Sequence, residues 1–513
     1  MISWIIDAAF SAHMTFIVVS RSPSVISPRF NAVRGCLPVL VLVALAASIT
    51  GTPSSAAASA VPTPAERMLA REVLRSLIEI DTTAAHGTQV AAQTLADHLA
   101  KAGFAANDVR VLAPPDQPTR ANVVARLHGS GHAKPLLIIG HVDVVEAPRG
   151  SWSVDPFKLT EKDGFFYGRG VLDMKGEDTA VLMALMRMKR EGFKPDRDII
   201  VAFTADEEAG TADGVQWLLQ AHPELMRADL AINPDEGAAG LRAGQRIYYG
   251  VQTSTKRYIT YRLETHGKSG HTAIPQPDNA IYKLAAGLTR LGAFQFPIEL
   301  DDTTRAYFAR TASMESGQSR ADMIAVSGAQ PDVLAAERLT ANPERNANLR
   351  TTCVATLLKA GTVENALADN AQAIVQCRAL PADSPDFVYR TLVQVLADPA
   401  ISVIVTEPGQ VNPESPLTPE IVSRVEGVVH SMWPGVLVIP SLNIGASDST
   451  YTRAAGIPTY GLCSIFYDLD DDRSHGDDER ITVESFYQGV EFAYRLLKRM
   501  SQEGVAPPNA IPN

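Results

Sequence analysis

Apolar residues recur along the first part of the chain in two patterns, which indicate helices and buried strands. Over 65–80 and 89–102 they recur every three to four positions, which predicts two amphipathic helices. Strand-length apolar runs then alternate with another helical pattern. The runs cover 122–127, 136–140 and 198–204, and the helix covers 177–191. This alternation predicts an α/β domain in which helices cover a largely buried sheet.

From about residue 250, polar and apolar positions alternate one by one, which indicates a sheet with one exposed face. The expected strands are 257–264, 351–359, 371–378 and 401–405, with helices over 280–291 and 385–396. Together these elements predict a second, smaller α+β domain. The polar segment 296–348 is expected to elaborate this domain rather than to form a core.

Buried α/β character returns from about residue 413. Helices are expected over 420–431 and 483–499, and a strand over 457–466. A chain of 513 residues also exceeds the usual size of a single core. We therefore expect a first domain made of 61–249 and 409–513, with the second domain, 250–408, inserted into it.

Residues 1–60 are predicted to be a leader. Arg29 and Arg34 precede an apolar run over 37–49, and small residues follow. This order is typical of a secretory signal peptide, and the run is shorter than the ~20 residues of a spanning helix. We expect a secreted or periplasmic protein, cleaved near Ala58 or Ala60, that keeps no stable membrane partner. The alternative is a protein anchored in the membrane by the uncleaved segment.

Charge and cysteine content narrow the range of functions. The formal net charge of -11 and the pI near 5.5 provide no basic surface field, so no nucleic-acid partner is expected. Cys36 lies in the predicted leader. Of the three remaining cysteines, at least one has no partner within the chain, and no disulfide framework is implied.

A histidine stands where one of the predicted strands ends. His141 directly follows the apolar run 136–140, at the position where open α/β sheets bind their ligands. Asp143 lies two residues on, on the same strand face, and is placed to orient the imidazole. A single histidine at a strand end is commonly structural, so the functional interpretation depends on the other residues that share such positions.

Acidic residues occupy similar loops. Asp173 lies in a glycine-flanked turn before the helix 177–191, where a carboxylate could bridge two cations. After the run 198–204 come three adjacent acids, which repel one another unless a cation or water relieves them. These acids are Asp206, Glu207 and Glu208, and further clusters contain Asp235, Glu236 and His475. Two imidazoles with several carboxylates suit a dinuclear site of divalent ions such as zinc.

Seven motifs follow one another along the chain. They are His141-Val-Asp143, Gly168-Arg-Gly-Val-Leu-Asp173-Met-Lys-Gly176, Asp206-Glu-Glu208, Asp235-Glu-Gly237, Gly270-His271, Gly445-Ala-Ser-Asp448 and Ser474-His475-Gly. In this order, over about 65–499, the chain resembles the M20 metallopeptidase family, which includes glutamate carboxypeptidase, aminoacylase and carboxypeptidase S. The resemblance implies an α/β catalytic domain with a mixed sheet between helices. It also implies an inserted ferredoxin-like α+β lid domain that commonly dimerises.

The resemblance implies a role for each matching residue. Two divalent metal ions, most simply zinc with cobalt or manganese as alternatives, would be held by His141, Asp173, Glu208, Glu236 and His475. Asp173 would bridge both ions. Glu236 is chosen because it directly precedes Gly237, and Asp235 remains the alternative. Glu207 would be the general base toward a water that both ions activate, and Asp143 would support His141.

Three further residues match positions in the predicted lid. His271 resembles a histidine that in dimeric relatives reaches the partner's active site and stabilises an oxyanion. Arg378 would clamp a substrate carboxylate, and Asn365 would make a companion polar contact.

The expected reaction is cleavage of a peptide or N-acyl amide bond beside a free carboxylate, carried out by a homodimer. A carboxypeptidase is favoured, and an aminoacylase or a dipeptidase is the alternative. A binding homologue without catalysis is disfavoured, because the base and every ligand are present.

Overall fold

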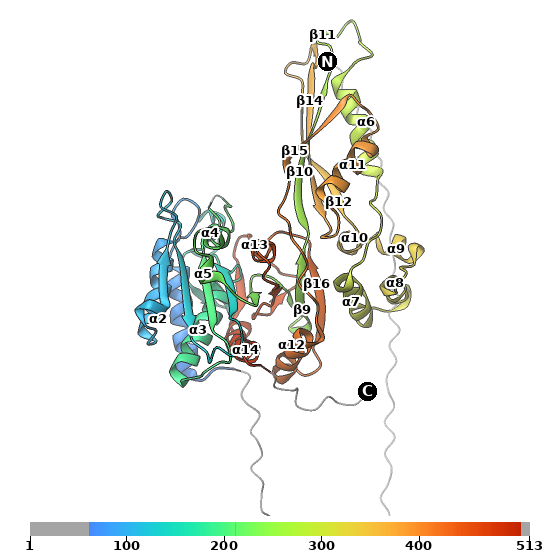
Figure 1. Ribbon diagram of the computed structural model, residues 1–513. Coiled ribbons are helices and arrows are strands. Elements are labelled where there is room, and N and C mark those ends of the chain that lie inside the picture. The colour runs from blue at the N-terminus through green and yellow to red at the C-terminus, as the bar shows by residue number, and fades with distance from the viewer. Residues whose placement is uncertain (1–60, 211, 504–513) are drawn as a thin grey trace, which may run out of the picture. The chain divides into compact units, whose positions relative to one another are not determined.

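The computed structural model describes residues 61–210 and 212–503, which Figure 1 draws in colour. The leader predicted over 1–60 lies outside the described residues. Within the described ranges, no helix is both long enough and apolar enough to cross a bilayer.

The larger sheet is mixed and contains ten strands. In order along the sheet these are β1 (Val109–Leu112), β2 (Asn122–Leu127), β6 (Ile199–Thr204), β3 (Leu136–His141), β7 (Leu230–Asn233), β17 (Thr459–Gly461), β9 (Gln245–Thr255), β8 (Ala239–Arg242) and β18 (Tyr467–Asp468), with β16 (Leu437–Asn443) paired to β9. β3 pairs in parallel with both β6 and β7, so the carboxyl ends of these three strands lie together. A separate small sheet contains β19 (Arg480–Thr482), β5 (Phe165–Tyr167) and β4 (Thr160–Lys162).

Helices cover both faces of the larger sheet, because its central strands carry apolar side chains on both faces. Along β3, Leu136 and Ile138 belong to one core, and Leu137 and Ile139 belong to another. The first core includes α1 (Pro64–Ile78), α2 (Gln89–Lys101), α3 (Lys175–Glu191), α12 (Pro419–Met432) and α14 (Val483–Met500); the second includes α4 (Gly214–Ala221), α5 (Pro223–Met226) and part of α13 (Ser449–Ala454). The predicted α/β class with a mixed sheet between helices is confirmed.

Residues 257–407 contain a four-stranded antiparallel sheet. Its order is β12 (Thr352–Ala360), β14 (Asn370–Ala379), β10 (Arg257–His266) and β15 (Ile401–Glu407), and α6 (Ala280–Ala293) and α11 (Pro385–Leu396) share its core. This connectivity is the split β-α-β-β-α-β arrangement of ferredoxin-like domains. Along β10 fully buried side chains alternate with more exposed ones, as the period of two predicts. A two-stranded pair, β11 (Gly270–His271) and β13 (Ala366–Leu367), extends from these elements.

A disulfide joins two strands of the smaller sheet. Cys353 on β12 lies opposite Cys377 on β14, and the two form the bond. Cys463 is free and buried. The spacing of the cysteines in the sequence did not predict this pair. The two cysteines meet only because of the register between β12 and β14, and local sequence does not reveal that register.

The segment 296–348 forms four helices: α7 (Asp302–Thr311), α8 (Gly317–Ser327), α9 (Val333–Leu339) and α10 (Pro343–Leu349). We call α7–α10 the helical insert. It encloses a small core of its own around Phe308, Met323 and Leu339, and α7 packs against β16 of the larger sheet. The expectation that this segment elaborates the second domain without forming a core is therefore wrong. Its apolar residues are sparse, but their helical spacing brings them together between short helices.

Two other expectations differ from the structure. The strand expected over 457–466 is shorter, because after Gly461 the chain is a buried loop. In that loop the N–H groups of Ser464 and Ile465 donate to Glu177 at 2.7 and 2.8 Å instead of to a neighbouring strand. In addition, β9 continues to Thr255, beyond the expected boundary at 249, so the chain crosses to the smaller sheet at Lys256.

Candidate metal centre and active site

The carboxyl ends of β6, β3 and β7 place candidate ligands at one edge of the larger sheet. His141 is the last residue of β3. Glu207 and Glu208 follow β6, and Asp235 follows β7. Because neighbouring parallel strands end side by side, residues from distant parts of the sequence converge there.

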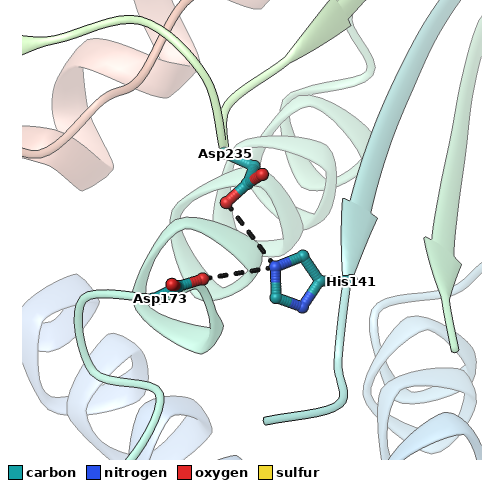
Figure 2. A group of neighbouring side chains, drawn as sticks. All are labelled: His141, Asp173 and Asp235. Carbon is teal, nitrogen blue, oxygen red and sulfur yellow. Dashed lines mark ion pairs between the residues drawn. The ribbon is translucent and has the colours of Figure 1, made fainter. Parts of the chain in front are cut away.

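His141 is buried and lies beside two carboxylates, as Figure 2 shows. Its Nε2 atom is 3.3 Å from Asp173 Oδ1 and 3.5 Å from Asp235 Oδ1. On the other side of the ring, Nδ1 is 3.1 Å from the carbonyl oxygen of Asp143. Burial by itself lowers the pKa of His141, but Asp173 and Asp235 raise it well above its usual value. A cation at Nε2 would meet the same two carboxylates.

Asp173 lies between two imidazoles. Its Oδ1 atom faces His141, and its Oδ2 atom is 3.1 Å from His475 Nε2. The same nitrogen of His475 is 2.9 Å from Glu208 Oε1. Hydrogen bonds to Asp173 and Glu208 raise the pKa of His475 to about 10. Burial opposes ionisation of Asp173, yet its two histidine partners lower its pKa. A carboxylate that faces two separate imidazoles is placed to bridge two cations.

Glu479 holds the loop that carries Asp173. Its buried carboxylate accepts hydrogen bonds from the N–H groups of Gly170 at 2.9 Å and Asp173 at 3.1 Å. It also pairs with the buried guanidinium of Arg169 at 2.6 Å. Glu479 lies in the same loop region as His475, so one carboxylate ties together the two loops that supply these ligands.

The carboxylate of Asp143 orients two glutamates. It accepts hydrogen bonds from the N–H groups of Glu207 at 3.3 Å and Glu208 at 3.1 Å. The nearest carboxylate oxygen of Asp143 is 3.7 Å from His141 Nδ1, farther than the backbone carbonyl of Asp143. Burial raises the pKa of Asp143 to about 6. The expected contact with His141 is therefore made chiefly by the backbone of Asp143, while its side chain positions the loop after β6.

These side chains surround a cavity of about 630 Å³, which we call the central cavity. Its lining is His141, Asp173, Glu207, Glu208, Asp235, Asn443, Gly445, Ala446, Ser474 and His475. Burial raises the pKa of Glu207 well above its usual value. The negative charges of Asp235 and Glu208 add to this shift, although His141 opposes it. A carboxyl group of raised pKa at a reaction site is suited to accept and return a proton.

Three overlapping sets of side chains have their ligand atoms within 4.8 Å of one another. The sets are His141, Asp173 and Asp235; His141, Glu207 and Glu208; and Asp173, Glu208 and His475. Acids at this spacing repel one another, and divalent cations would relieve the repulsion. Imidazole and carboxylate donors suit zinc and similar divalent ions. The residues present therefore fit a pair of such ions.

Glu236 was the predicted ligand, but its side chain has other partners. It is buried and accepts hydrogen bonds from Ser449 at 2.6 Å and Asn443 at 3.2 Å. The equally buried Arg453 forms an ion pair with it at 3.4 Å. Glu236 belongs to none of the three sets of ligand atoms, and its neighbour Asp235 does. The geometry thus favours Asp235, the alternative in the sequence motif.

His271 and Asn365 lie together, away from the residues that line the central cavity. His271 is exposed on β11, opposite Ala366 on β13, and its Nδ1 accepts a hydrogen bond from the N–H of Ala273 at 3.1 Å. Asn365 directly precedes β13, and its carbonyl accepts a hydrogen bond from Thr272 at 3.5 Å. Neither residue lines the central cavity of its own chain among the described residues.

Arg378 lies beside the wall of the central cavity. Its Nη1 atom donates to the carbonyl oxygen of Gly445 at 2.8 Å, and Gly445 is part of that wall. The guanidinium also lies over the ring of Tyr258, 4.5 Å from its centroid, and burial lowers its pKa. These two contacts hold the guanidinium of Arg378 in place. Within the described residues its Nη2 atom has no hydrogen-bond partner, so one donor group is available to a ligand.

Asn443 and Arg453 were not predicted for the site. Asn443 lines the central cavity, and both residues bind Glu236. The one available signal was the position of Asn443 at the end of an apolar run, 437–442. The role of Arg453 depends on the packing of α13 against α4 and β17, which brings Arg453 to Glu236, and it has no signal in the local sequence.

Comparison with known proteins places this site in a family. An N-fatty-acyl-amino acid synthase/hydrolase, PM20D1, of Xenopus tropicalis is 27% identical over 394 residues, which cover 75% of this chain and 76% of that protein. A probable carboxypeptidase S-like 2 of Dictyostelium discoideum is 27% identical over 378 residues and covers 71% of each. The crystal structure of an M20 family metallo-carboxypeptidase from Sulfolobus solfataricus shares the fold, with a TM-score of 0.60 at 16% identity, over 84% of this chain and 99% of that one. The profile described as peptidase family M20/M25/M40 matches residues 137–499, and the chain belongs to this family.

Proposed function

We propose that the protein is a hydrolase with two divalent metal ions that cleaves the amide bond of an N-acyl amino acid or a peptide beside a free carboxylate. The observation that carries the proposal is the position of Asp173 between His141 and His475. Zinc is the proposed metal, with cobalt or manganese as alternatives, because the donors are imidazole and carboxylate groups.

Two of the three sets of ligand atoms share Asp173, and they support one assignment of ligands. Asp173 would serve both ions. His141 and Asp235 would complete the ligands of one ion, and Glu208 and His475 would complete those of the other. In this assignment Glu207 is not a metal ligand, and its carboxylate remains available for proton transfer.

The protein's own residues have distinct tasks in the proposed reaction. When bound, the two ions supply Lewis acidity, which lowers the pKa of water and polarises a carbonyl group. Glu207 accepts a proton from the attacking water and passes it to the nitrogen of the leaving amine as the amide bond breaks. Asp143 keeps Glu207 at the cavity by holding the backbone of its loop.

Arg378 is the group proposed to recognise the free carboxylate. It is fixed against Gly445 at the cavity wall and keeps a donor nitrogen available. A planar guanidinium can bind both oxygens of a carboxylate, which a lysine does not reproduce. Recognition at this point would select amides whose amine part is an amino acid with a free carboxyl group.

N-acyl amino acids are our first choice of substrate. The sequence motifs favoured a carboxypeptidase, but the PM20D1 relative, which matches three quarters of this chain, is named for N-fatty-acyl-amino acids. The carboxypeptidase S-like relative supports peptide substrates as the second choice. Both choices share the scissile amide beside a carboxylate.

We also propose a homodimer formed through the smaller sheet. β12 is an edge strand, and Val354, Leu357 and Leu358 on it are 60%, 67% and 69% exposed. Exposed apolar edge strands are sites of pairing between chains. In such a dimer His271 of the partner subunit, with Asn365 beside it, would supply a donor to the developing oxyanion.

Export from the cytosol is proposed on two grounds. The order of basic, apolar and small residues before 61 is that of a signal peptide. In addition, Cys353 and Cys377 form a disulfide, and such bonds persist chiefly in oxidising compartments. Mass analysis of the exported protein should give a chain that begins near Ala58 or Ala60, whereas a membrane-anchored protein would retain the apolar run.

The proposed reaction is tested by measuring hydrolysis of matched N-acyl amino acids, dipeptides and longer peptides by metal-loaded protein. Glu207→Gln should lower kcat by about 10²–10⁴-fold, because the proton acceptor is lost. The control is Glu337→Gln at an exposed position of α9. Wild-type turnover in Glu207→Gln would contradict the assignment of the base. Failure of the wild-type protein to cleave any member of the panel would reject hydrolysis and favour a binding protein.

A further inference from the structure

A second large cavity lies between the helical insert and the larger sheet. It has a volume of about 640 Å³, and we call it the insert cavity. Its wall includes Asp235 and Asn443, which also line the central cavity. The two cavities therefore adjoin at the proposed ligand Asp235 and at Asn443, so the insert cavity lies beside the place where the scissile amide would bind.

Apolar side chains stand among polar ones in the wall on both sides of the insert cavity. The strands of the larger sheet and their adjoining loops contribute Ile247, Ile439, Leu442, Ile444 and Leu469, and the helical insert with its connecting turn contributes Met314 and Met323. Methionine side chains adapt to ligands of irregular shape. The helical insert thus supplies one wall of a space that the larger sheet would otherwise leave open.

The guanidinium groups and several amide groups in the wall already have partners. Arg345 pairs with Glu315 at 2.6 Å, and Arg242 pairs with Asp470 at 3.1 Å. The side chain of Asn342 accepts a hydrogen bond from the backbone of its own helix at 2.9 Å. Both guanidinium groups of the wall are therefore paired, and the cavity presents no unpaired cation to an anionic ligand.

Three tyrosines also line this wall. They are Tyr248, Tyr307 and Tyr467. Burial, with the nearby charge of Glu344, raises the pKa of Tyr248 to about 12, so its hydroxyl is neutral at physiological pH. Burial raises the pKa of Tyr307 and Tyr467 as well. Neutral aromatic rings can line the path of an apolar chain at little desolvation cost.

We propose that the insert cavity holds the acyl chain of a medium- or long-chain N-acyl amino acid, and that the helical insert selects the length of that chain. This inference rests on the proposed function, since it requires the scissile amide to lie at the central cavity. A volume of about 640 Å³ lies in the range of ~300–1,000 Å³ typical of ligand pockets. An acetyl group would leave most of the insert cavity empty. A medium or long acyl chain would fill it and remove its apolar side chains from water.

Two substitutions that fill the insert cavity test the proposal. Met314→Trp narrows it from the helical insert, and Leu469→Trp narrows it from the loop after β18. The control is Met68→Trp, which places the same side chain at a 75% exposed position on α1. Two different positions are used so that misfolding of one variant leaves the other to decide.

The first measurement is kcat/KM over a series of N-acyl derivatives of one amino acid, from acetyl to hexadecanoyl. Both filling variants should lose at least about tenfold on the long chains, which corresponds to about two buried methylene groups, and keep wild-type values for acetyl. The control should match the wild type throughout. Equal loss for all chain lengths would overturn the proposal. Loss confined to longer peptides would also overturn it, in favour of a peptide site.

The second measurement is binding of dodecanoate, followed by calorimetry, which does not depend on turnover. The wild-type protein and Met68→Trp should bind it, and both filling variants should bind at least about tenfold more weakly. If no substrate is cleaved but this difference is found, the proposed hydrolysis fails and the cavity assignment holds. If dodecanoate does not bind, or binds equally to all four proteins, the cavity assignment is overturned.

Discussion

Asp235 and Glu236 are neighbours in the sequence with opposite surroundings. Asp235 faces His141 in the central cavity, whereas Glu236 turns toward Ser449 and Arg453 in the interior. Both follow an apolar strand and precede Gly237, so the local sequence does not separate them. Their roles are decided by partners from β16 and α13, which lie far along the chain.

The first prediction is that Asp235→Asn and Glu236→Gln fail in different ways. Asp235→Asn removes a proposed ligand and should weaken the binding of one of the two ions by at least about tenfold. Glu236→Gln leaves the buried charge of Arg453 without its partner, so it should lower the free energy of unfolding by about 3 kcal/mol while metal content is kept. Metal analysis and denaturant unfolding distinguish the two. Equal metal loss in both variants would contradict the assignment of Asp235.

The second prediction concerns Lys256, which lies buried between β9 and β10 and donates to the carbonyl of Arg350 at 2.7 Å. Burial lowers the pKa of Lys256 to about 7, whereas the unfolded chain holds this proton up to about pH 10. Between these values the unfolded state binds more protons, so the free energy of unfolding should rise with pH. Below about pH 7 both states are protonated and this contribution is constant.

Lys256→Met should remove that rise, as measured by urea unfolding between about pH 6 and pH 10. Lys134→Met changes a lysine whose side chain is 80% exposed and should leave the rise intact. A rise of the same size in wild type and Lys256→Met would assign it to other groups.

Secondary-structure elements differed in how well the sequence predicted them. β3, β6 and α3 follow continuous apolar runs or a helical period, and they were predicted to within a few residues. β9 was not predicted, because its last four residues, Gln252 to Thr255, are polar and yet buried. Some of those side chains have partners on other elements, such as Thr303, which hydrogen-bonds Thr253 at 2.5 Å, whereas the buried hydroxyl of Ser254 has no hydrogen-bond partner among the described residues. Periodicity does not detect a polar strand of this kind.

The third prediction concerns the disulfide between β12 and β14. The bond joins residues with a sequence separation of 24. By restricting the conformations of the unfolded chain, a cross-link of this length should stabilise the folded state by about 3 kcal/mol. Cys353→Ser combined with Cys377→Ser should lower the free energy of unfolding by about that amount, with kcat/KM on acetyl substrates unchanged. Reduction of the wild type should reproduce the loss, and reduction of the double variant should change nothing. A double variant as stable as the oxidised wild type would contradict the estimate.

At the scale of the whole molecule, the proposed dimer links the smaller sheet to the active site. The fourth prediction is that Leu357→Lys combined with Leu358→Lys shifts the protein from dimer to monomer, because charges on an edge strand oppose its pairing. Val90→Lys, at a 63% exposed position on α2, is the matched control. Sedimentation measures the change, and kcat should fall with the dimer if His271 of the partner subunit takes part. A monomeric wild-type protein would reject the proposed interface.

The sequence by itself determined the division into buried α/β and alternating α+β regions, and it identified the strand ends after which His141 and Glu208 lie and the loops that carry Asp173 and His475. These features are local, because the burial of one or both faces of a strand or helix sets the period of apolar residues along that element. Only the tertiary structure gave Asp235 and Glu236 their different surroundings, paired Cys353 with Cys377, and packed the helical insert against β16 beside a second cavity. These depend on strand register and on contacts between distant segments, and neither is recorded in the local order of residues.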